Sequence, residues 1–277
     1  MQGTAKRSLA ADGEGSDSKR AKTKKQWRTP RKGEDTRRAI EAGDSGIWAT
    51  CDKGKEAKCV GELKDLFTEV AESMYSDLSD AKDDAADGSA DINIEADIAQ
   101  ELEDLRKPAA DPLIQSVRID VQCVLFFETR SPIEPVAFVR RICEDAAKDT
   151  ERKRTRFAKR LTPMTLMGKA TEKGIEEVAK QVLAPHFHQE PIVQKKFAIR
   201  LSIRNHNVMK RDEVIEWVAA AVGPPHKVDL KGYDLLVLVE IYTNVCGMSV
   251  VGRDFEELKR YNLAEIYEPT PKVVASC

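Results

Sequence analysis

The sequence predicts an α/β protein with a mixed or mostly parallel sheet and helices packed on it, because three observations agree. Apolar residues alternate at period two in short runs, and between these runs they recur every three or four residues, as on one face of a helix. Hydrophobic residues make up 41% of the 277 residues, which suffices for a core, and 33% are charged. Strand-type and helix-type segments follow one another along the chain, which is typical of a sheet covered by helices.

Residues 1–43 are predicted to be a disordered basic tail. Residues 1–42 contain twelve Lys or Arg and six Asp or Glu, a net charge of +6, with hardly any aliphatic side chains. Such a segment buries too little apolar surface to offset its loss of conformational entropy. The pairs Lys19-Arg20 and Lys24-Lys25 indicate a solvated tail, a nuclear localisation signal or a phosphate-binding arm. We therefore expect an intracellular protein of the nucleus or nucleolus, or of the cytoplasm.

The pattern of residues 44–150 predicts a first domain that resembles a small ferredoxin-like sandwich. Gly46–Cys51 is a strand candidate, and apolar residues at helical spacing follow it. Val117–Phe127 is expected to form the next strand, and Pro135 suits the first turn of a second helix. Residues 77–111 hold twelve acids and three bases, a net charge of −9, and are predicted to be a disordered acidic insertion. This insertion is either a tolerated surface loop or a competitor for the basic surfaces.

Residues 151–268 predict a second domain in which the alternation is clearer. Thr171 can cap a helix, and Phe197–Ile203 alternates as a half-buried strand. Another helix begins near Lys210 and is stopped by Gly223-Pro224-Pro225. The continuous apolar run Leu235–Val239 is expected to be a central strand with both faces covered. Residues 269–277 are expected to form a flexible C-terminal tail.

No pattern in the sequence indicates catalysis, so we expect neither an enzyme nor a bound cofactor. Gly13-Glu14-Gly15 follows no strand and lacks the third glycine of a dinucleotide loop. No glycine-rich turn is present that would hold a nucleotide, S-adenosylmethionine or acetyl-CoA. His186 and His188 have no neighbouring Cys or carboxylate cluster, so no metal site is expected either.

The cysteines and the apolar runs exclude two further classes of protein. Six cysteines lie far apart without a CxxC pair, which indicates reduced thiols rather than a disulfide scaffold. Cys51, Cys123 and Cys143 are expected to be small core residues. The longest apolar runs are far below the roughly 18 residues of a membrane-spanning helix, so no membrane partner is expected.

The positive signal is basic charge on the second domain. Between Lys195 and Arg211 the chain has six Lys or Arg and no acid. If Phe197–Ile203 turns its apolar residues inward, then Arg200 and Arg204 point outward together. Lys210 and Arg211 begin the next helix, where free N–H groups favour phosphate. These residues therefore favour phosphate binding over an ordinary cationic surface.

A second basic patch and the scarcity of aromatic residues narrow the kind of ligand. Residues 152–160 contain six Lys or Arg, and Lys227 and Lys231 add charge near the last core strand. Aromatic residues make up only 6% of the chain, which leaves no platform for stacking single-stranded bases. Several patches on one small domain are typical of a protein that holds a folded nucleic acid by its backbone and ends.

Several motifs, in order, resemble the family of THUMP-domain tRNA acetyltransferase adaptors. The resemblance covers about Gly43 to Glu268. The motifs that carry it are the segments 46–51, 160–171, 197–200, 204–207, 225–231, 246–252 and 255–262. The resemblance implies a ferredoxin-like domain followed by a THUMP domain that binds the acceptor end of tRNA.

The resemblance also implies a function without catalysis by this chain. The family is needed for N4-acetylcytidine formation in the D-arm of certain tRNAs, and a separate ATP-dependent RNA acetyltransferase transfers the acetyl group from acetyl-CoA. The chain ends soon after the module, so we expect no fused enzyme, no small-molecule substrate and a tRNA plus that acetyltransferase as partners. Two alternatives stay open: a binding module for another structured RNA such as pre-ribosomal RNA, and a novel RNA-modifying enzyme. The expected RNA-binding residues are Arg160, Lys169, Arg200, Arg204, Asn205, His206, Asn207, Lys210, Arg211, Lys227 and Lys231.

Overall fold

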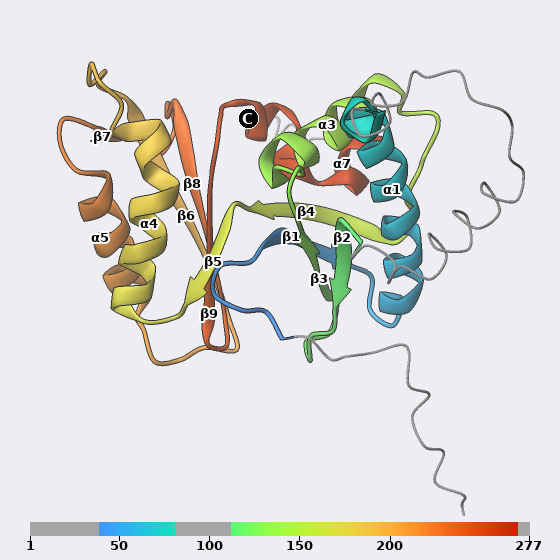
Figure 1. The fold of residues 1–277 in the computed structure, drawn as a ribbon, viewed down its shortest axis with the longest axis horizontal. Helices are drawn as coiled ribbons and strands as arrows, with labels where there is room; N and C mark the ends of the chain where they lie inside the picture. Colours follow the sequence, from blue (N-terminus) through green and yellow to red (C-terminus); the bar gives the residue numbers. More distant parts are fainter. Residues whose placement is uncertain (1–38, 81–111, 271–277) are drawn as a thin grey trace, which may run out of the picture. The chain divides into compact units, whose positions relative to one another are not determined.

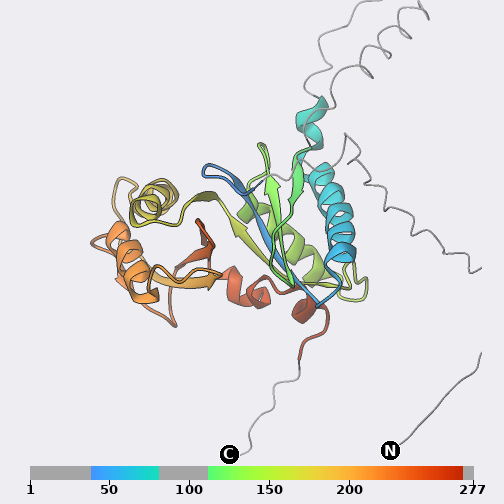
Figure 2. The ribbon, with the colours of Figure 1, turned by 90° about the horizontal axis from the view of Figure 1, so that it is seen from below.

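The computed structural model describes residues 39–80 and 112–270, which form two sheets with helices. The first sheet is antiparallel, in the order β2-β3-β1-β4. Its strands are β1 (Ser45–Cys51), β2 (Ile114–Val117), β3 (Val124–Thr129) and β4 (Ala158–Met164). The helices α1 (Glu56–Asp80) and α3 (Pro135–Lys148) lie on the same face of this sheet (Figures 1 and 2). This β-α-β-β-α-β order with the strand order 4-1-3-2 is the ferredoxin-like arrangement.

Aromatic packing joins the first sheet to its helices. The Phe67 ring of α1 lies 5.1 Å from Phe127 of β3 and 5.6 Å from Phe138 of α3, edge to face in both cases. Such pairs add about 0.5–1.5 kcal/mol each beyond the burial of their area. Pro135 begins α3 as predicted, and the Glu134 carboxylate accepts hydrogen bonds from the free N–H groups of that first turn.

The second sheet is mixed, in the order β5-β9-β8-β6-β7. Its strands are β5 (Leu166–Lys169), β6 (Lys196–Arg204), β7 (Lys227–Val228), β8 (Leu235–Tyr242) and β9 (Val245–Val251). β7, β6 and β8 are parallel, whereas β8, β9 and β5 are antiparallel. The helices α4 (Glu172–Phe187) and α5 (Arg211–Val222) cover one face (Figure 1). The predicted fold class, α/β with a mixed sheet, is therefore confirmed.

The expected elements of the second sheet are present for the expected reasons. Thr171 caps α4 by accepting the N–H of Gly174, and α5 ends at Gly223. Phe197 and Leu201 of β6 are buried against these helices, while β8 is an interior strand. Alternation at period two thus correctly separated the helix-covered face of β6 from its other face.

The C-terminal segment packs on the first sheet and its helix rather than on α4 and α5. It consists of α6 (Asp254–Glu257), a 3₁₀ turn η1 (Lys259–Tyr261) and α7 (Leu263–Tyr267). Phe255 and Tyr261 are buried in the same core as Phe67. The Arg140 guanidinium of α3 donates two hydrogen bonds to Asp254, at 2.9 and 3.0 Å. Residues 252–268 therefore complete the first core, although the sequence analysis assigned them to the second domain.

Two further sequence expectations differ from the structure. Val117–Phe127 is not one strand: residues 118–123 turn, because polar Asp120 and Gln122 interrupt the apolar run. β4 pairs with β1, so the strand after residue 150 belongs to the first sheet. Most of the predicted basic tail, most of the predicted acidic insertion and residues 271–277 lie outside the described residues. The last residue of the predicted tail, Gly43, donates a hydrogen bond to Met167 O. The start of the predicted insertion is helical, because α1 extends to Asp80.

Candidate nucleic-acid interface

Arg200 and Arg204 lie on the face of β6 that turns away from α4 and α5. On that face Ala198 is 4% exposed and belongs to the first core, so the face is partly covered. The Arg200 guanidinium pairs with Glu256 at 3.0 Å and lies 5.1 Å from the centre of the Phe255 ring. Arg204 pairs with Glu240 of β8 at 3.7 Å. The two arginines are thus held in ion pairs, and they do not form the free outward-facing cationic stripe that the sequence analysis expected.

Arg160 and Arg260 join these two side chains in what we call the arginine cluster, defined as Arg160, Arg200, Arg204 and Arg260. Arg260 of η1 pairs with Glu256 at 2.8 Å, so one carboxylate serves two arginines. Arg160, on β4, interacts electrostatically with the other three arginines. The side chains of Arg200, Arg204 and Arg260 remain 39%, 29% and 53% exposed. Four cations and two carboxylates leave the cluster with a net positive charge at a solvent-accessible surface.

The pKa values of the cluster reflect an excess of positive charge. Desolvation, followed by Arg200 and Arg260, lowers the pKa of Arg160. Burial raises the pKa of Glu240, against the opposing effect of Arg204. Burial also opposes ionisation of Glu256, but the hydrogen bonds from Arg260 and Arg200 outweigh it and lower the pKa of Glu256. An anion bound beside Arg160 would offset the repulsion among the guanidinium groups, and phosphate fits their fork of donors.

The residues from 205 to 211 serve mainly to fold the connection between β6 and α5. Asn205 turns the chain with a φ of 51°. His206 uses both ring nitrogens within the protein: Nδ1 donates to Thr243 O at 2.5 Å, and Nε2 accepts the Met209 N–H at 3.2 Å. Arg211 donates to Leu201 O at 2.7 Å. We therefore remove His206 from the direct RNA contacts, since both of its ring nitrogens have partners in the protein. Arg211 is exposed and uses one N–H for Leu201 O, so it stays a predicted RNA contact.

The other predicted residues are distributed over the second sheet. Lys210 pairs with Glu213 at 3.2 Å, and Asn207 is exposed. Lys169 ends β5 and Lys227 begins β7, which are opposite edges of the sheet, so the structure does not bring them together. Lys231 is exposed and its N–H donates to Asp229. Among these positions, Lys231 lies near the arginine cluster, because it lines a hollow of about 270 Å³ together with Glu256.

Half of the basic residues in the patch at residues 152–160 form ion pairs. Lys153 pairs with Glu268 at 2.8 Å, Lys159 with Asp52 at 2.5 Å, and Arg154 with Glu69. Of the six basic residues there, only Arg160 interacts with the arginine cluster. The sequence analysis missed Arg260 and the two carboxylates, because nothing local to residues 240, 256 or 260 indicates that they meet β6.

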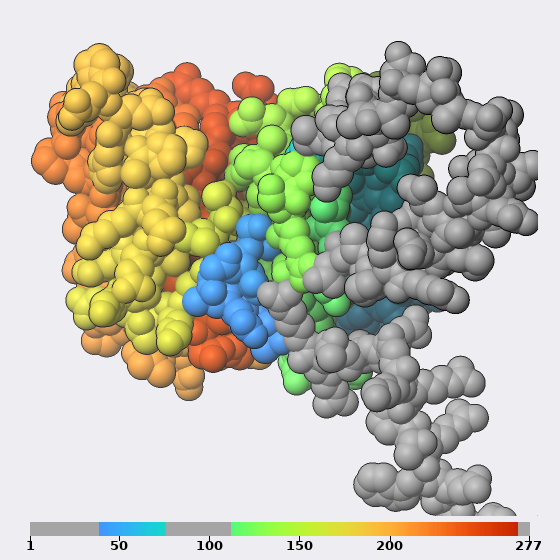
Figure 3. Space-filling view, viewed as in Figure 1, coloured from blue at the N-terminus to red at the C-terminus, as the bar shows by residue number. Residues whose placement is uncertain are grey.

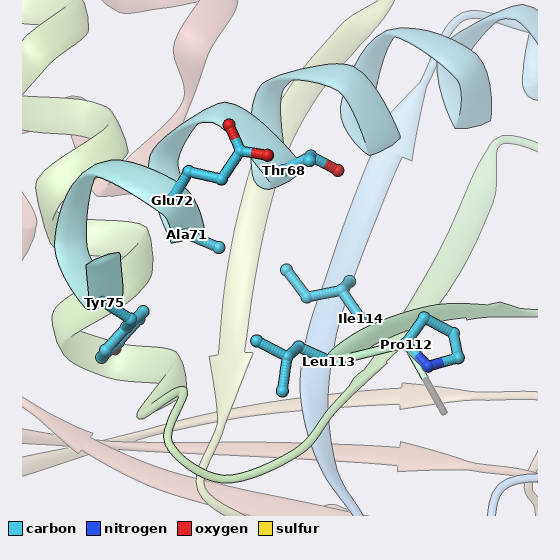
Figure 4. Close-up of a pocket in the computed structure, with 7 residues that line it drawn as sticks. All are labelled: Thr68, Ala71, Glu72, Tyr75, Pro112, Leu113 and Ile114. Atoms are coloured by element: carbon cyan, nitrogen blue, oxygen red, sulfur yellow. The ribbon is translucent and has the colours of Figure 1, made fainter. Parts of the chain in front are cut away.

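Two hollows in the described part of the chain are less suited to a polyanion. A groove of about 420 Å³ between α1 and β2 is lined by apolar and acidic or neutral side chains, with Leu113 41% exposed (Figure 4). A second hollow, of about 430 Å³, lies beside the start of α4 where Lys169 and Lys173 line it. Ala42 and Gly43 also line this hollow. In Figure 3, the chain's first described residues, coloured blue, lie beside the yellow part of the chain. Glu177 also lines this second hollow, and it is therefore less cationic than the arginine cluster.

The described residues contain no group of three His, Cys, Asp or Glu side chains that could hold a metal ion. Within the same part of the chain, no helix is both long and apolar enough to cross a membrane.

The comparison with protein families places a THUMP domain at residues 169–251, which begins at the last residue of β5 and ends with β9. This chain is therefore a THUMP-domain protein. Over 251 residues the chain is 35% identical to the tRNA acetyltransferase TAN1 of Saccharomyces cerevisiae, covering 83% of this chain and 86% of TAN1. It is 33% identical over 243 residues to human THUMP domain-containing protein 1, covering 85% and 67% of the two chains. The chain belongs to this family of TAN1 and THUMP domain-containing protein 1.

Among solved structures, the chain is similar to the solution structure of the THUMP domain of THUMP domain-containing protein 1. The two are 34% identical, and the match covers 29% of this chain and 83% of that chain with a TM-score of 0.26.

Proposed function

We propose that this protein is a tRNA-binding adaptor for cytidine acetylation. In this proposal it presents a cytidine of the tRNA D-arm to a separate ATP-dependent RNA acetyltransferase and has no catalytic activity of its own. The observation that carries the proposal is the arginine cluster, in a chain that is related over most of its length to a protein named as a tRNA acetyltransferase. We further propose that the bound feature is the tRNA acceptor end and that the protein acts in the nucleus or nucleolus.

The arginine cluster supports binding to an RNA backbone. Phosphate contacts dominate the affinity of proteins for nucleic acids and orient the ligand. Glu256 and the Phe255 ring hold the Arg200 guanidinium in place before RNA arrives, so less side-chain entropy is lost on binding. Glu256 and Glu240 compete with phosphate for the arginines. Each arginine is therefore expected to contribute moderately to RNA affinity, and this contribution should decrease with salt.

As an adaptor, the protein would position the tRNA relative to the acetyltransferase. A protein that binds tRNA at one surface and the acetyltransferase at another raises the effective concentration of the cytidine at the active site. The contacts within the arginine cluster account for RNA binding and require no reactive group in this chain.

The decisive experiment is acetylation of tRNA reconstituted from purified components. With the acetyltransferase, ATP and acetyl-CoA, addition of the protein is expected to increase N4-acetylcytidine formation, while the protein alone with tRNA and acetyl-CoA yields none. The assay uses the adaptor at a concentration near the Kd of the unaltered protein for tRNA. At that concentration the double variant Arg200→Gln/Arg260→Gln is expected to lose most of the stimulation. Arg118→Gln/Arg141→Gln is the matched control, because Arg118, in the turn after β2, and Arg141, which pairs with Asp145 on α3, are both exposed and lie outside the cluster. Product made by the protein alone, or equal stimulation by both double variants, would contradict the proposal.

A further inference from the structure

Three cysteines lie together where β1 ends, apart from the arginine cluster. Cys51 is the last residue of β1, Cys59 is in the first turn of α1, and Cys123 directly precedes β3. The ladder between β1 and β3 pairs Thr50 with Val124, and at the next step the Cys51 N–H donates to Cys123 O over 3.0 Å. The Cys59 thiol hydrogen-bonds to the Cys51 thiol. Cys51 therefore has one cysteine beside it on the sheet and another on the helix.

The backbone geometry of Cys51 and Cys123 is compatible with a disulfide. Residues that face each other on antiparallel strands have Cα atoms about 4.5–5.5 Å apart. Disulfides join Cα atoms that are about 4.4–6.8 Å apart. Cys123 has a φ of 63°, which is uncommon for a residue other than glycine, and its N–H donates to the Glu56 carboxylate at 3.0 Å instead of continuing the ladder.

The three thiols differ in their access to solvent and in their charge environment. Cys51 and Cys59 are buried, whereas Cys123 is half-buried and is not the core residue that the sequence analysis expected. Burial raises the pKa of Cys59 to about 12, so this thiol remains protonated. Burial also raises the pKa of Cys51, and the hydrogen bond from Cys59 acts in the opposite direction. The Lys159 ammonium, which pairs with Asp52, also interacts electrostatically with the side chains of Cys51 and Cys123.

We propose that Cys123 and Cys51 are an oxidation site for hydroperoxides that closes to an intramolecular disulfide. The Cys123 thiolate attacks the terminal oxygen of the hydroperoxide, the O–O bond breaks, the alcohol leaves with a proton, and Cys123 becomes a sulfenic acid. The Cys51 sulfur then attacks the Cys123 sulfur, the S–O bond breaks, and water leaves with the Cys51 proton as the S–S bond forms. Two thiols are oxidised and one hydroperoxide is reduced to an alcohol and water.

This disulfide would join the two ends of a long part of the chain. Residues 52–122, which include the acidic segment 77–111, would become one covalently closed loop. The inference rests on contacts of the first sheet and is independent of the proposed RNA-binding function.

Mapping the tryptic peptides of the full chain under non-reducing conditions tests the proposal. After treatment with hydrogen peroxide and alkylation, cleavage at Lys and Arg puts Cys51, Cys59 and Cys123 in separate peptides, residues 39–53, 59–64 and 119–130. We expect a cross-linked pair of peptides 39–53 and 119–130 that is absent before treatment and disappears on reduction. The variant Cys123→Ser is expected to abolish the pair, while Cys59→Ser and the buried control Cys143→Ser retain it.

Three results would overturn the proposal. They are a cross-link mainly between peptides 39–53 and 59–64, oxidation of Cys123 to sulfinic acid without any cross-link, or cross-links found only between two molecules. Because the map of the unaltered protein already separates these outcomes, the test does not depend on the folding of a variant.

Discussion

Glu256→Gln and Arg200→Gln change the charge of the arginine cluster in opposite directions, and tRNA affinity should follow the charge. The Glu256 carboxylate accepts hydrogen bonds from Arg200, Arg260 and Tyr233, at 3.0, 2.8 and 3.1 Å. A glutamine keeps the shape and one acceptor oxygen but removes a charge that competes with phosphate. Arg200→Gln removes a cation and leaves Glu256 paired with Arg260 alone.

The size of these effects can be estimated from the number of phosphate contacts. Each contact contributes about 0.9 to the slope of log affinity against log salt, so Arg200→Gln should flatten the slope by up to ~0.9. Between 50 and 200 mM salt this difference amounts to about 3.5-fold in affinity. A half-exposed charged contact contributes ~1 kcal/mol, so affinity at low salt should fall about 5-fold. Glu256→Gln should instead bind more tightly and show a steeper slope.

Fluorescence anisotropy with labelled tRNA at four salt concentrations measures both quantities. Arg141→Gln is the control, because this arginine is 46% exposed and pairs with Asp145 at 2.8 Å outside the arginine cluster. Unfolding midpoints must match the unaltered protein. Weaker binding by a folded Glu256→Gln protein, or equal losses for Arg200→Gln and Arg141→Gln, would refute the reasoning.

Three other predictions concern the folded state. Gly46→Ala should lower the free energy of unfolding by about 1–3 kcal/mol in urea titrations, since its Cβ would lie 2.4 Å from Phe127 O and 2.5 Å from the Phe126 ring; Gly61→Ala, in an open helical position, is the control. Asp229 has a pKa lowered to about 2, chiefly by the Gly232 N–H and Lys196, so its stabilisation is complete above about pH 4 and is lost as pH falls toward 2. The difference in stability between the unaltered protein and Asp229→Asn should therefore shrink over that range, and a difference that grows on acidification would contradict it. His206→Ala should cost about 1–2 kcal/mol of stability by thermal or urea unfolding and leave tRNA affinity within 2-fold, and a large loss of affinity at full stability would restore His206 as an RNA contact.

Local patterns predicted the parts of the fold that depend on local physics. The period-two alternation in β6 and the cap at Thr171 depend on residues within one segment, and both are found as predicted. Pro135 begins α3 because its fixed φ and missing N–H suit the first turn of a helix. The short strand β2 was missed because it is only four residues long, and periodicity is weak over that length.

The candidate site depends on contacts that no local pattern contains. The stretch from Lys195 to Arg211 has no acid of its own, which indicated a free cationic surface. Its two outward arginines are instead paired with Glu240 and Glu256, which come from later parts of the chain. For the same reason, sequence reasoning could place Arg160 in a basic patch but could not bring it together with Arg260.

If the arginine cluster binds RNA as proposed, the ferredoxin-like part contributes directly to that binding. Arg160 lies on β4 of the first sheet, whereas Arg200 and Arg204 lie on β6 of the second sheet. Their separation is fixed by packing between the sheets: Ser249 of β9 donates to Pro163 O of β4 at 2.7 Å, and Trp48 contacts Tyr242 at 5.4 Å between ring centres. A Cβ on Gly247 would lie 2.5 Å from the sulfur of Met167 and 2.7 Å from that of Met164, so both methionine side chains would have to shift. A substitution at this packing contact, outside the arginine cluster, should therefore weaken RNA binding by moving Arg160 relative to Arg200.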